Sequence, residues 1–441
     1  SSHFASGRVR GGRSIFLLLG DNKAGNRFIF KGLFVVMSSF SHTIEIPDVE
    51  SPVTEALGEI FSANTRALQK IVKEHKKLQD QVAALTRERN AITQEADRIR
   101  EENMRLKTVL RGSGAAVEAE RPYVLEKELK LHSAPVHCVA TKNTPSSCLM
   151  ASGSWDASVN IYDLVRNTSQ RLNDPRNAPA PSEQRMGGVY SVAFGKTQAA
   201  SHILGCASCD RSVYIWNYQT GEQLKRLQGH TNEVNDIDFH NFQQVICTAS
   251  DDFSALIWDY KEGAKLRMLE AHTAAVYGAT FLGEDHEYLV ATCCFDKKIR
   301  LFDMRDKSVV KTLEGHGDDI IGIDYNSSVR SIATGSDDGM IMTWDSRKSW
   351  RCSSKLNTKD EDFPENEVKR VAFSPDGSEL AAACSSGQVL IYDYHSGEMT
   401  ARLPNHWDCV FDVAWTTLPS GRKVITTASH DHLTRIWMER Q

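Results

Sequence analysis

Histidine, serine and aspartate, the residue types of a hydrolase triad, recur together from residue 131 onward. In one such set His230 precedes Ser250, Asp252 and Trp258. Polar side chains at fixed spacing can also serve a structural purpose, because buried polar groups must satisfy one another's hydrogen bonds. A hydrogen-bond chain from histidine to hydroxyl to aspartate to aromatic ring would tie a loop to a tight turn. We therefore predict that these side chains are structural and not catalytic.

Cysteine spacing could point to a metal site. Cys206 and Cys209 form a CxxC pair, and Cys293 and Cys294 are adjacent. A structural zinc ion needs four convergent ligands, however, and no second pair stands at suitable spacing. The sequence also has no HExxH motif, no nucleophile elbow and no glycine-rich phosphate loop ending in Lys-Ser or Lys-Thr. We expect no catalytic residue, no metal and no cofactor, and we predict that the protein is not an enzyme.

The polar sets belong to a unit that repeats seven times. Each unit ends in an apolar residue, an aromatic residue and usually aspartate, and successive aromatics stand 54, 42, 44, 42, 48 and 45 residues apart. An aspartate stands six positions before each aromatic except in the sixth unit, where Ser386 replaces it, and a serine or cysteine stands eight positions before. The seven aromatics are Tyr162, Trp216, Trp258, Phe302, Trp344, Tyr392 and Trp437, and five units have an upstream histidine: His132, His230, His272, His316 and His406.

These repeats resemble those of the WD-repeat family over about 310 residues. The resemblance implies an all-β, seven-bladed β-propeller with four strands in each blade. Only four residues follow Trp437, too few for the outer strand of the last blade. We expect residues 122–130 to supply that strand and close the ring, so that the propeller spans residues 122–441. Blade six, which lacks both histidine and aspartate, should be held more loosely.

A seven-residue apolar period runs through residues 51–111, between a helix start at Ser51-Pro52 and a stop at Arg111-Gly112. About eight heptads predict an α-helical coiled coil roughly 90 Å long, and Asn103 at an a position favours two strands in register. The predicted fold is therefore a propeller preceded by a coiled coil that forms a parallel homodimer, with residues 112–121 as a linker. The dimer seam contains Leu57, Ile71, Leu78, Leu85, Ile92, Ile99, Asn103 and Leu106.

Residues 1–50 are expected to be a disordered leader. Residues 1–36 are basic and nearly free of acid, which is typical of a transit peptide or of a non-native extension upstream of Met37. We favour the extension, because the residues after Met37 form a polar leader that runs into the first helix.

The charge and the cysteine content of the sequence limit the classes of partner that we expect the protein to bind. Residues 112–441 hold 34 basic and 44 acidic residues, so the bulk of the protein lacks the basic surface that nucleic acid or an anionic membrane attracts. Ten cysteines, mostly inside apolar runs, suit buried free thiols in a reducing compartment. We expect a cytoplasmic protein that binds proteins or peptides, binds no nucleic acid, and associates with membranes only through its partners.

The inner strands of the blades read Val-x-x-apolar-x-aromatic, with Ile replacing Val in blade five and Thr141 replacing the aromatic residue in blade one. The residue after the first apolar position should point toward the channel mouth on the face of the histidine loops, and the insertions at residues 173–187 and 359–367 should overhang this face. Aromatic side chains with a few polar groups dominate protein-binding hot spots, although some of these residues could instead pack between blades. The candidate binding residues are His137, Tyr190, Asn235, Tyr277, Ile321, Lys369 and Phe411, with Trp155, Phe295 and Trp407 beside them.

Three stretches inside the blades resemble the autophagy-sixteen family: DFSALIW at 252–258, FDKKIRLFDMR at 295–305 and RVAFSPDG at 370–377. This resemblance implies a dimeric, non-catalytic scaffold that directs attachment of a ubiquitin-like protein to membrane lipid. A faint likeness in the first helix implies that Leu57, Ile60 and Phe61 contact the conjugated partner.

Two alternative functions stay open. The stretches FDMR at 302–305 and WDSR at 344–347 resemble the Trp-Asp-x-Arg ending of propellers that bind a cullin ubiquitin ligase adaptor. A substrate receptor of such a ligase is therefore the first alternative. A G-protein β-like or lissencephaly-like scaffold is the second.

Overall fold

The structure is a computed structural model that describes residues 4–9, 13–18, 73–77, 79–82, 84, 87, 98, 122–144, 147–172, 187–404 and 406–440. The chain divides into two compact units, Ser1–Glu102 and Asn103–Gln441. Among the described residues, no helix is long and apolar enough to cross a membrane.

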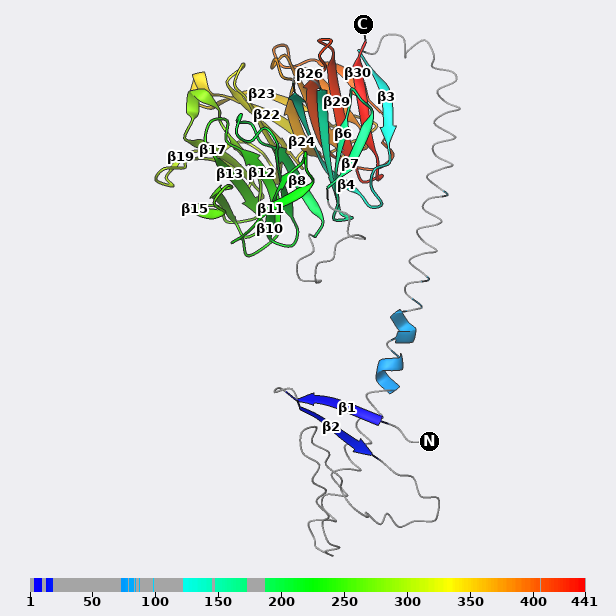
Figure 1. Ribbon diagram of the computed structural model, residues 1–441. Coiled ribbons are helices and arrows are strands. Elements are labelled where there is room, and N and C mark those ends of the chain that lie inside the picture. The colour runs from blue at the N-terminus through cyan, green and yellow to red at the C-terminus, as the bar shows by residue number, and fades with distance from the viewer. Residues whose placement is uncertain are drawn as a thin grey trace, which may run out of the picture. The chain divides into compact units, whose positions relative to one another are not determined.

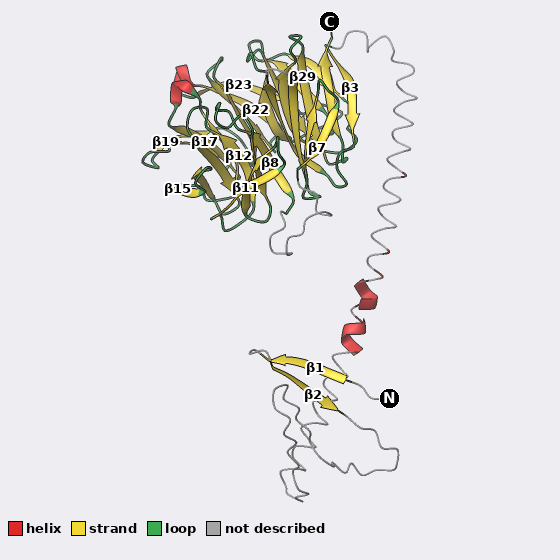
Figure 2. Cartoon of the chain, in the orientation of Figure 1, coloured by secondary structure: helices red, strands yellow, loops and turns green. Residues whose placement is uncertain are grey.

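Seven four-stranded antiparallel sheets in the larger unit form a seven-bladed β-propeller, shown in Figure 1 and, by type of secondary structure, in Figure 2. Blade one contains β4 (Val136–Thr144), β5 (Ser147–Ser154), β6 (Val159–Asp163) and β7 (Thr168–Arg171). Blade two contains β8 (Val189–Phe194), β9 (Ile203–Ser208), β10 (Ser212–Asn217) and β11 (Glu222–Gln228). Blade three contains β12 (Val234–Phe239), β13 (Val245–Ser250), β14 (Ser254–Asp259) and β15 (Ala264–Glu270).

The remaining blades repeat this order from the inner to the outer strand. Blade four contains β16 (Val276–Phe281), the short 3-10 helix η2 (Glu284–His286), β17 (Leu289–Cys294), β18 (Lys298–Asp303) and β19 (Val309–Glu314). Blade five contains β20 (Ile320–Asn326), β21 (Ser331–Ser336), β22 (Met340–Asp345), the 3-10 helix η3 (Ser346–Lys348) and β23 (Arg351–Asn357). Blade six contains β24 (Val368–Phe373), β25 (Glu379–Cys384), β26 (Val389–Asp393) and β27 (Met399–Leu403), and blade seven contains β28 (Val410–Thr417), β29 (Lys423–Ser429) and β30 (Thr434–Glu439).

The outer strand of blade seven comes from the other end of the propeller sequence. β3 (Tyr123–Leu129) pairs antiparallel with β30, from Tyr123 opposite Glu439 to Leu129 opposite Thr434. The Tyr123 hydroxyl also donates a hydrogen bond to the Glu379 carboxylate of blade six at 2.8 Å. The first and last strands of the propeller therefore share one sheet, and the strand edge of β30 is covered.

The apolar core lies between neighbouring blades, because middle strands are buried on both faces. One cluster joins Leu227 of blade two to Ile237, Leu256 and Trp258 of blade three. Outer strands are largely exposed: Leu227 is the only buried residue of β11. Each blade needs a neighbour to bury its second face, which explains why the repeats close into a ring.

Every inner strand carries a β-bulge at its second residue. In β16, for example, the pairing with β17 passes from Val276 directly to Gly278 and skips Tyr277. A bulged residue is left out of the ladder, so its side chain can be aimed differently from its neighbours. The skipped residues are His137, Tyr190, Asn235, Tyr277, Ile321, Lys369 and Phe411.

The described residues of the smaller unit include one pair of strands. β1 (Phe4–Val9) pairs antiparallel with β2 (Arg13–Leu18), with Phe4 opposite Leu18. Arg10-Gly11-Gly12 stands between them in the sequence, and glycine favours hairpin connections. Residues 73–77, 79–82, 84, 87 and 98 are helical.

The rest of the predicted coiled coil, including its eight named seam residues, the Leu57, Ile60 and Phe61 set and the linker at 112–121, lies outside the described residues. The same holds for residues 173–186 of the first insertion.

Candidate functional site

The recurring polar residues form a buried hydrogen-bond chain in five blades. In blade three, His230 Nδ1 lies 2.7 Å from Asp252 Oδ2 and His230 Nε2 lies 2.7 Å from Thr248 Oγ1. The Trp258 indole N–H donates to the same threonine oxygen at 2.9 Å. The histidines of these chains are buried. Their ring nitrogens lie within hydrogen-bond distance of protein groups, as those of His230 do.

The hydroxyl in this chain is not the serine predicted from the repeat. It belongs to the residue two positions earlier, in the pairs His132–Ser152, His230–Thr248, His272–Thr292, His316–Thr334 and His406–Thr427, all at 2.7 to 2.8 Å. Ser250 instead donates to the Glu233 carbonyl at 2.7 Å and accepts from the Asp252 N–H at 3.1 Å. Residues i and i+2 of a strand point to the same face, so repeat spacing alone did not separate the two hydroxyls.

The aspartates of the chains are held in their charged form. Burial alone would raise the pKa of Asp338, but hydrogen bonds from His316 and the Gly317 N–H outweigh it and lower the pKa to about 2. The carboxylate therefore accepts hydrogen bonds that clamp the histidine loop to the turn between β21 and β22.

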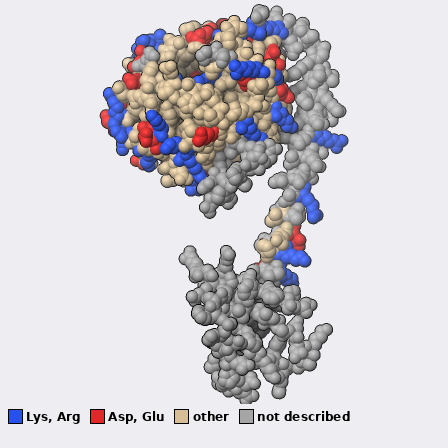
Figure 3. Space-filling model, in the orientation of Figure 1, with Lys and Arg blue, Asp and Glu red and all other residues tan. Residues whose placement is uncertain are grey.

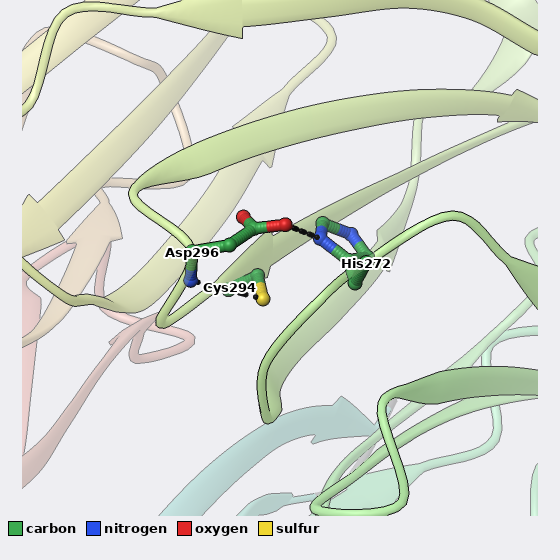
Figure 4. Close-up of side chains that lie close together, drawn as sticks. All are labelled: His272, Cys294 and Asp296. Carbon is green, nitrogen blue, oxygen red and sulfur yellow. Dashed lines mark hydrogen bonds and ion pairs between the residues drawn. The ribbon is translucent and has the colours of Figure 1, made fainter.

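Blade four contains the cluster most like a metal site, drawn in Figure 4: His272, Cys294 and Asp296 lie close together. The Arg300 guanidinium sits at this point, 2.5 Å from His272 Nδ1 and 2.6 Å from Asp296 Oδ2. A fixed cation there opposes binding of a metal ion. Cys294 accepts the Asp296 N–H at 3.2 Å, as Ser250 does for Asp252 in blade three, and burial raises the pKa of its thiol to about 12. The cluster is a variant of the structural chain.

Blades two and six replace the missing histidine in different ways. In blade two the Tyr214 hydroxyl donates to Asp210 Oδ2 at 2.5 Å. In blade six Asn366 accepts the Ser386 N–H at 3.3 Å and donates to the Thr358 carbonyl at 3.1 Å. The Ser386 hydroxyl is buried and has no hydrogen-bond partner among the described residues.

The seven bulged residues of the inner strands surround one cavity of about 80 Å³. Ser191, Arg370 and Asp412 also line it. Arg370 reaches across blades to Asp236 at 3.3 Å and to Asp412 at 3.5 Å. All seven strand residues singled out in the sequence thus line one cavity at the channel mouth.

One side of the mouth, over blades seven and one, is aromatic. The His137 ring stacks on Phe411 with centroids 4.6 Å apart and on Trp155 at 6.2 Å. His430 packs edge-on against Phe411 at 5.7 Å and Trp155 at 5.6 Å. Trp155 is 46% exposed. These four rings, His137, Trp155, Phe411 and His430, are called the aromatic cluster below.

Burial is the main cause that lowers the pKa of His137 to about 4. Its imidazole is therefore neutral at neutral pH, and the aromatic cluster adds no positive charge there through His137.

Blades five and six supply the adjoining side of the mouth, which is acidic. The Lys369 ammonium lies 2.9 Å from Asp337 and 2.6 Å from Glu367. Asp319 belongs to the same loop region, since its carbonyl accepts the Asp337 N–H at 3.0 Å. Asp319, Asp337 and Glu367 are called the acidic wall below.

Three loop residues of the mouth were missed by the sequence reasoning: His430, Asp319 and Asp337. Glu367 is the last residue of the 359–367 insertion that was expected to overhang this face. His430 and Asp337 occupy the turn position that Trp155 holds in blade one, so the repeat spacing that singled out Trp155 could have found them. Of the two further aromatics named from the sequence, Phe295 stacks on Tyr277 at 5.1 Å. Trp407 is half-buried and does not line the cavity.

Two protein-family models match segments of the propeller. The model of the WD domain, G-beta repeat, matches residues 124–163, 221–259 and 263–303. The chain carries WD40 repeats. A second model, the nucleolar protein 10-like N-terminal domain, matches residues 310–441.

Individual relatives include a G-protein β subunit and two proteins with other names. The guanine nucleotide-binding protein subunit beta of Zea mays is 27% identical over 321 residues, 70% of this chain and 72% of that protein. Nuclear distribution protein nudF 1 of Talaromyces marneffei is 32% identical over 269 residues, 61% of this chain and 50% of that protein. DDB1- and CUL4-associated factor 10 of Xenopus tropicalis is 32% identical over 116 residues, 26% of this chain and 24% of that protein.

WD40 propellers are generally non-catalytic scaffolds that bind proteins, and the buried histidine chains of this one agree with that role. On the propeller face drawn in Figure 3, basic and acidic side chains are interspersed.

Proposed function

We propose that this protein is a non-catalytic interaction scaffold that binds a segment of a partner protein at the mouth of the propeller channel. The observation that carries the proposal is the convergence of seven bulged residues on one cavity, beside the partly exposed aromatic cluster. Large aromatic side chains in a concave site are the usual anchors of protein binding.

A variant with Tyr190, Tyr277 and Phe411 all changed to Ala tests this proposal. Proteins captured by the full chain should be lost from the triple variant, since truncating a hot spot costs at least about 2 kcal/mol of binding, roughly thirtyfold in affinity. The matched control is Phe242→Ala, which removes a 50% exposed aromatic in the turn between β12 and β13. Capture unchanged in a normally folded triple variant would show that the partner binds elsewhere.

The finer proposal is an autophagy-sixteen-like scaffold: a cytoplasmic homodimer, joined through residues 51–111, that directs conjugation of a ubiquitin-like protein to membrane lipid. It is supported by the blade stretches at 252–258, 295–305 and 370–377 and by the heptad period. Recovery of a ubiquitin-like conjugate in affinity purification would support it. Light scattering of the chain with Ile92 and Ile99 changed to Asp should report a monomer, because the seam would bury unpaired charges.

One geometric observation favours the cullin substrate receptor as a second candidate. Arg305 forms a two-pronged ion pair with Asp303, with Nε–Oδ1 at 2.9 Å and Nη2–Oδ2 at 2.6 Å. Arg347 repeats this arrangement with Asp345 in the next blade. Both guanidinium groups are mostly exposed, and the name of the Xenopus relative associates that protein with a cullin. Recovery of a cullin adaptor that is lost when both arginines become alanine would support this candidate.

A further inference from the structure

The channel mouth has an aromatic side and an acidic side. The aromatic cluster lies over blades seven and one, and the acidic wall lies over blades five and six, next to blade seven around the ring. Phe411 and Lys369 are equivalent residues of neighbouring inner strands, β28 and β24, and both line the cavity. An occupant of the mouth would therefore touch both surfaces at once.

The acidic wall holds more negative charge than its own cation balances. The ammonium of Lys369 contacts Asp337 and Glu367, and no ion pair to Asp319 is found among the described residues. Burial and the neighbouring Asp318 raise the pKa of Asp319, and burial raises the pKa of Asp337 despite Lys369. A second cation would stabilise these carboxylates in their charged form.

We propose that the segment bound at the channel mouth is a peptide in which a lysine or arginine side chain stands within about three residues of a large apolar side chain. This inference rests on the proposed function, because it describes the occupant of the same site. The apolar side chain packs on the aromatic cluster, and the cation pairs with the acidic wall. An extended chain advances about 3.3 Å per residue, which suits anchors on adjacent blades.

Charge complementarity selects this occupant. Three carboxylates, Asp319, Asp337 and Glu367, surround one paired ammonium, that of Lys369, and Lys297 also acts on Asp319 from the next loop. The excess negative charge would repel an acidic peptide. An arginine can form paired hydrogen bonds with one carboxylate, and its planar cation can also lie against the exposed Trp155 ring. A free small cation would leave the aromatic cluster uncovered, whereas a peptide covers both surfaces.

A random heptapeptide library displayed on phage and panned on the full chain tests the proposal, with counter-selection on the Tyr190, Tyr277 and Phe411 triple variant. Peptides that bind the wild type and not the triple variant should contain Lys or Arg within three positions of Phe, Trp, Leu, Ile or Met. Acidic or uncharged consensus sequences would overturn the proposal, as would recovery of no peptide. Capture of protein partners by the mouth is measured separately, so failure here is distinguishable from failure of the proposed function.

The leading basic peptide is then titrated by fluorescence polarisation. Asp337→Asn should weaken its binding about 3- to 10-fold, and the same peptide with its basic residue changed to Ala should bind both proteins equally. The matched control is Asp306→Asn, which removes an exposed carboxylate in the loop between β18 and β19. Equal affinity of wild type and Asp337→Asn for the basic peptide would overturn the role of the acidic wall.

Discussion

The buried histidine chains and the channel mouth lie close together on the same face of the propeller, yet they differ in how they use the repeat. Five blades build nearly the same chain, with His–hydroxyl distances that vary only from 2.7 to 2.8 Å. The seven equivalent mouth positions hold six different residue types, since only tyrosine occurs twice. Uniform residues at equivalent positions hold the blades together, whereas varied residues at equivalent positions make one asymmetric surface. The first set should govern stability and the second set should govern binding.

Removing the strand on which both regions depend should have the largest effect. Deletion of residues 122–130 removes β3, exposes the edge of β30 and takes away the buried side chains of Tyr123 and Leu129. We expect the melting temperature to fall by more than about 10 °C, since 1 kcal/mol corresponds to a few degrees in a domain of this size. Differential scanning calorimetry against a chain lacking residues 1–111 checks this, and equal melting temperatures would contradict closure by β3.

Thr248→Val tests a histidine chain directly. It leaves His230 Nε2 and the Trp258 indole N–H buried without the threonine hydroxyl that they contact. The free energy of unfolding should fall by about 3 kcal/mol, because each buried unsatisfied group costs about 1 to 3 kcal/mol. Tyr277→Phe at the mouth also removes one hydroxyl and should change stability by less than about 0.5 kcal/mol. Denaturant titration measures both variants. Similar losses in the free energy of unfolding for Thr248→Val and Tyr277→Phe would contradict the distinction between the chains and the mouth.

Lowering the pH should stabilise the folded state through Asp412 at the mouth and destabilise it through Asp338 in a histidine chain. Burial raises the pKa of Asp412 under the mouth to about 6, despite Arg370, while the pKa of Asp338 in a chain is lowered to about 2. The folded state therefore binds a proton at Asp412 before the unfolded chain does, and gains stability as pH falls from about 6 to 4. Asp338 contributes stability above about pH 4 that is lost as pH falls toward 2.

Melting curves of wild type, Asp412→Asn and Asp338→Asn from pH 7 to pH 3 measure these contributions. Wild type should gain about 2 kcal/mol relative to Asp412→Asn between pH 7 and pH 4. Its advantage over Asp338→Asn should stay constant to about pH 5 and shrink below pH 4. If the stability difference between wild type and Asp412→Asn changed with pH in the same direction as that between wild type and Asp338→Asn, the two aspartates would not have opposite pKa shifts.

Blade six offers the smallest effect. Ser386 stands where other blades have the aspartate of the chain, and its buried hydroxyl has no partner among the described residues. Ser386→Ala should therefore leave the unfolding free energy within about 0.5 kcal/mol of wild type or raise it slightly. A loss as large as that of Thr248→Val would mean that blade six contains a polar chain equivalent to the others.

Much of this arrangement could be predicted from repeat spacing. The Val-x-x-apolar-x-aromatic pattern placed Tyr277 and its six equivalents at one mouth, because a bulge recurs at the same residue of every inner strand. Glu367 could not be found in that way, since it comes from a connecting loop of irregular length between β23 and β24. The chain hydroxyl was misassigned because Thr248 and Ser250 point to the same face of one strand. The autophagy-sixteen assignment depends on residues that form the blade scaffold, which unrelated WD40 proteins also need.

The most direct test compares two neighbouring carboxylates in one turn of blade five. Asp338 accepts hydrogen bonds from His316 and the Gly317 N–H at 3.0 and 2.7 Å, whereas Asp337 contacts Lys369 at the mouth. The measurement is the free energy of unfolding of Asp338→Asn and Asp337→Asn, determined in parallel by denaturant titration. We predict a loss of about 1 to 3 kcal/mol for Asp338→Asn and a change within about 0.5 kcal/mol for Asp337→Asn. Equal losses, or a larger loss for Asp337→Asn, would contradict the division between residues that hold the blades and residues that bind a partner.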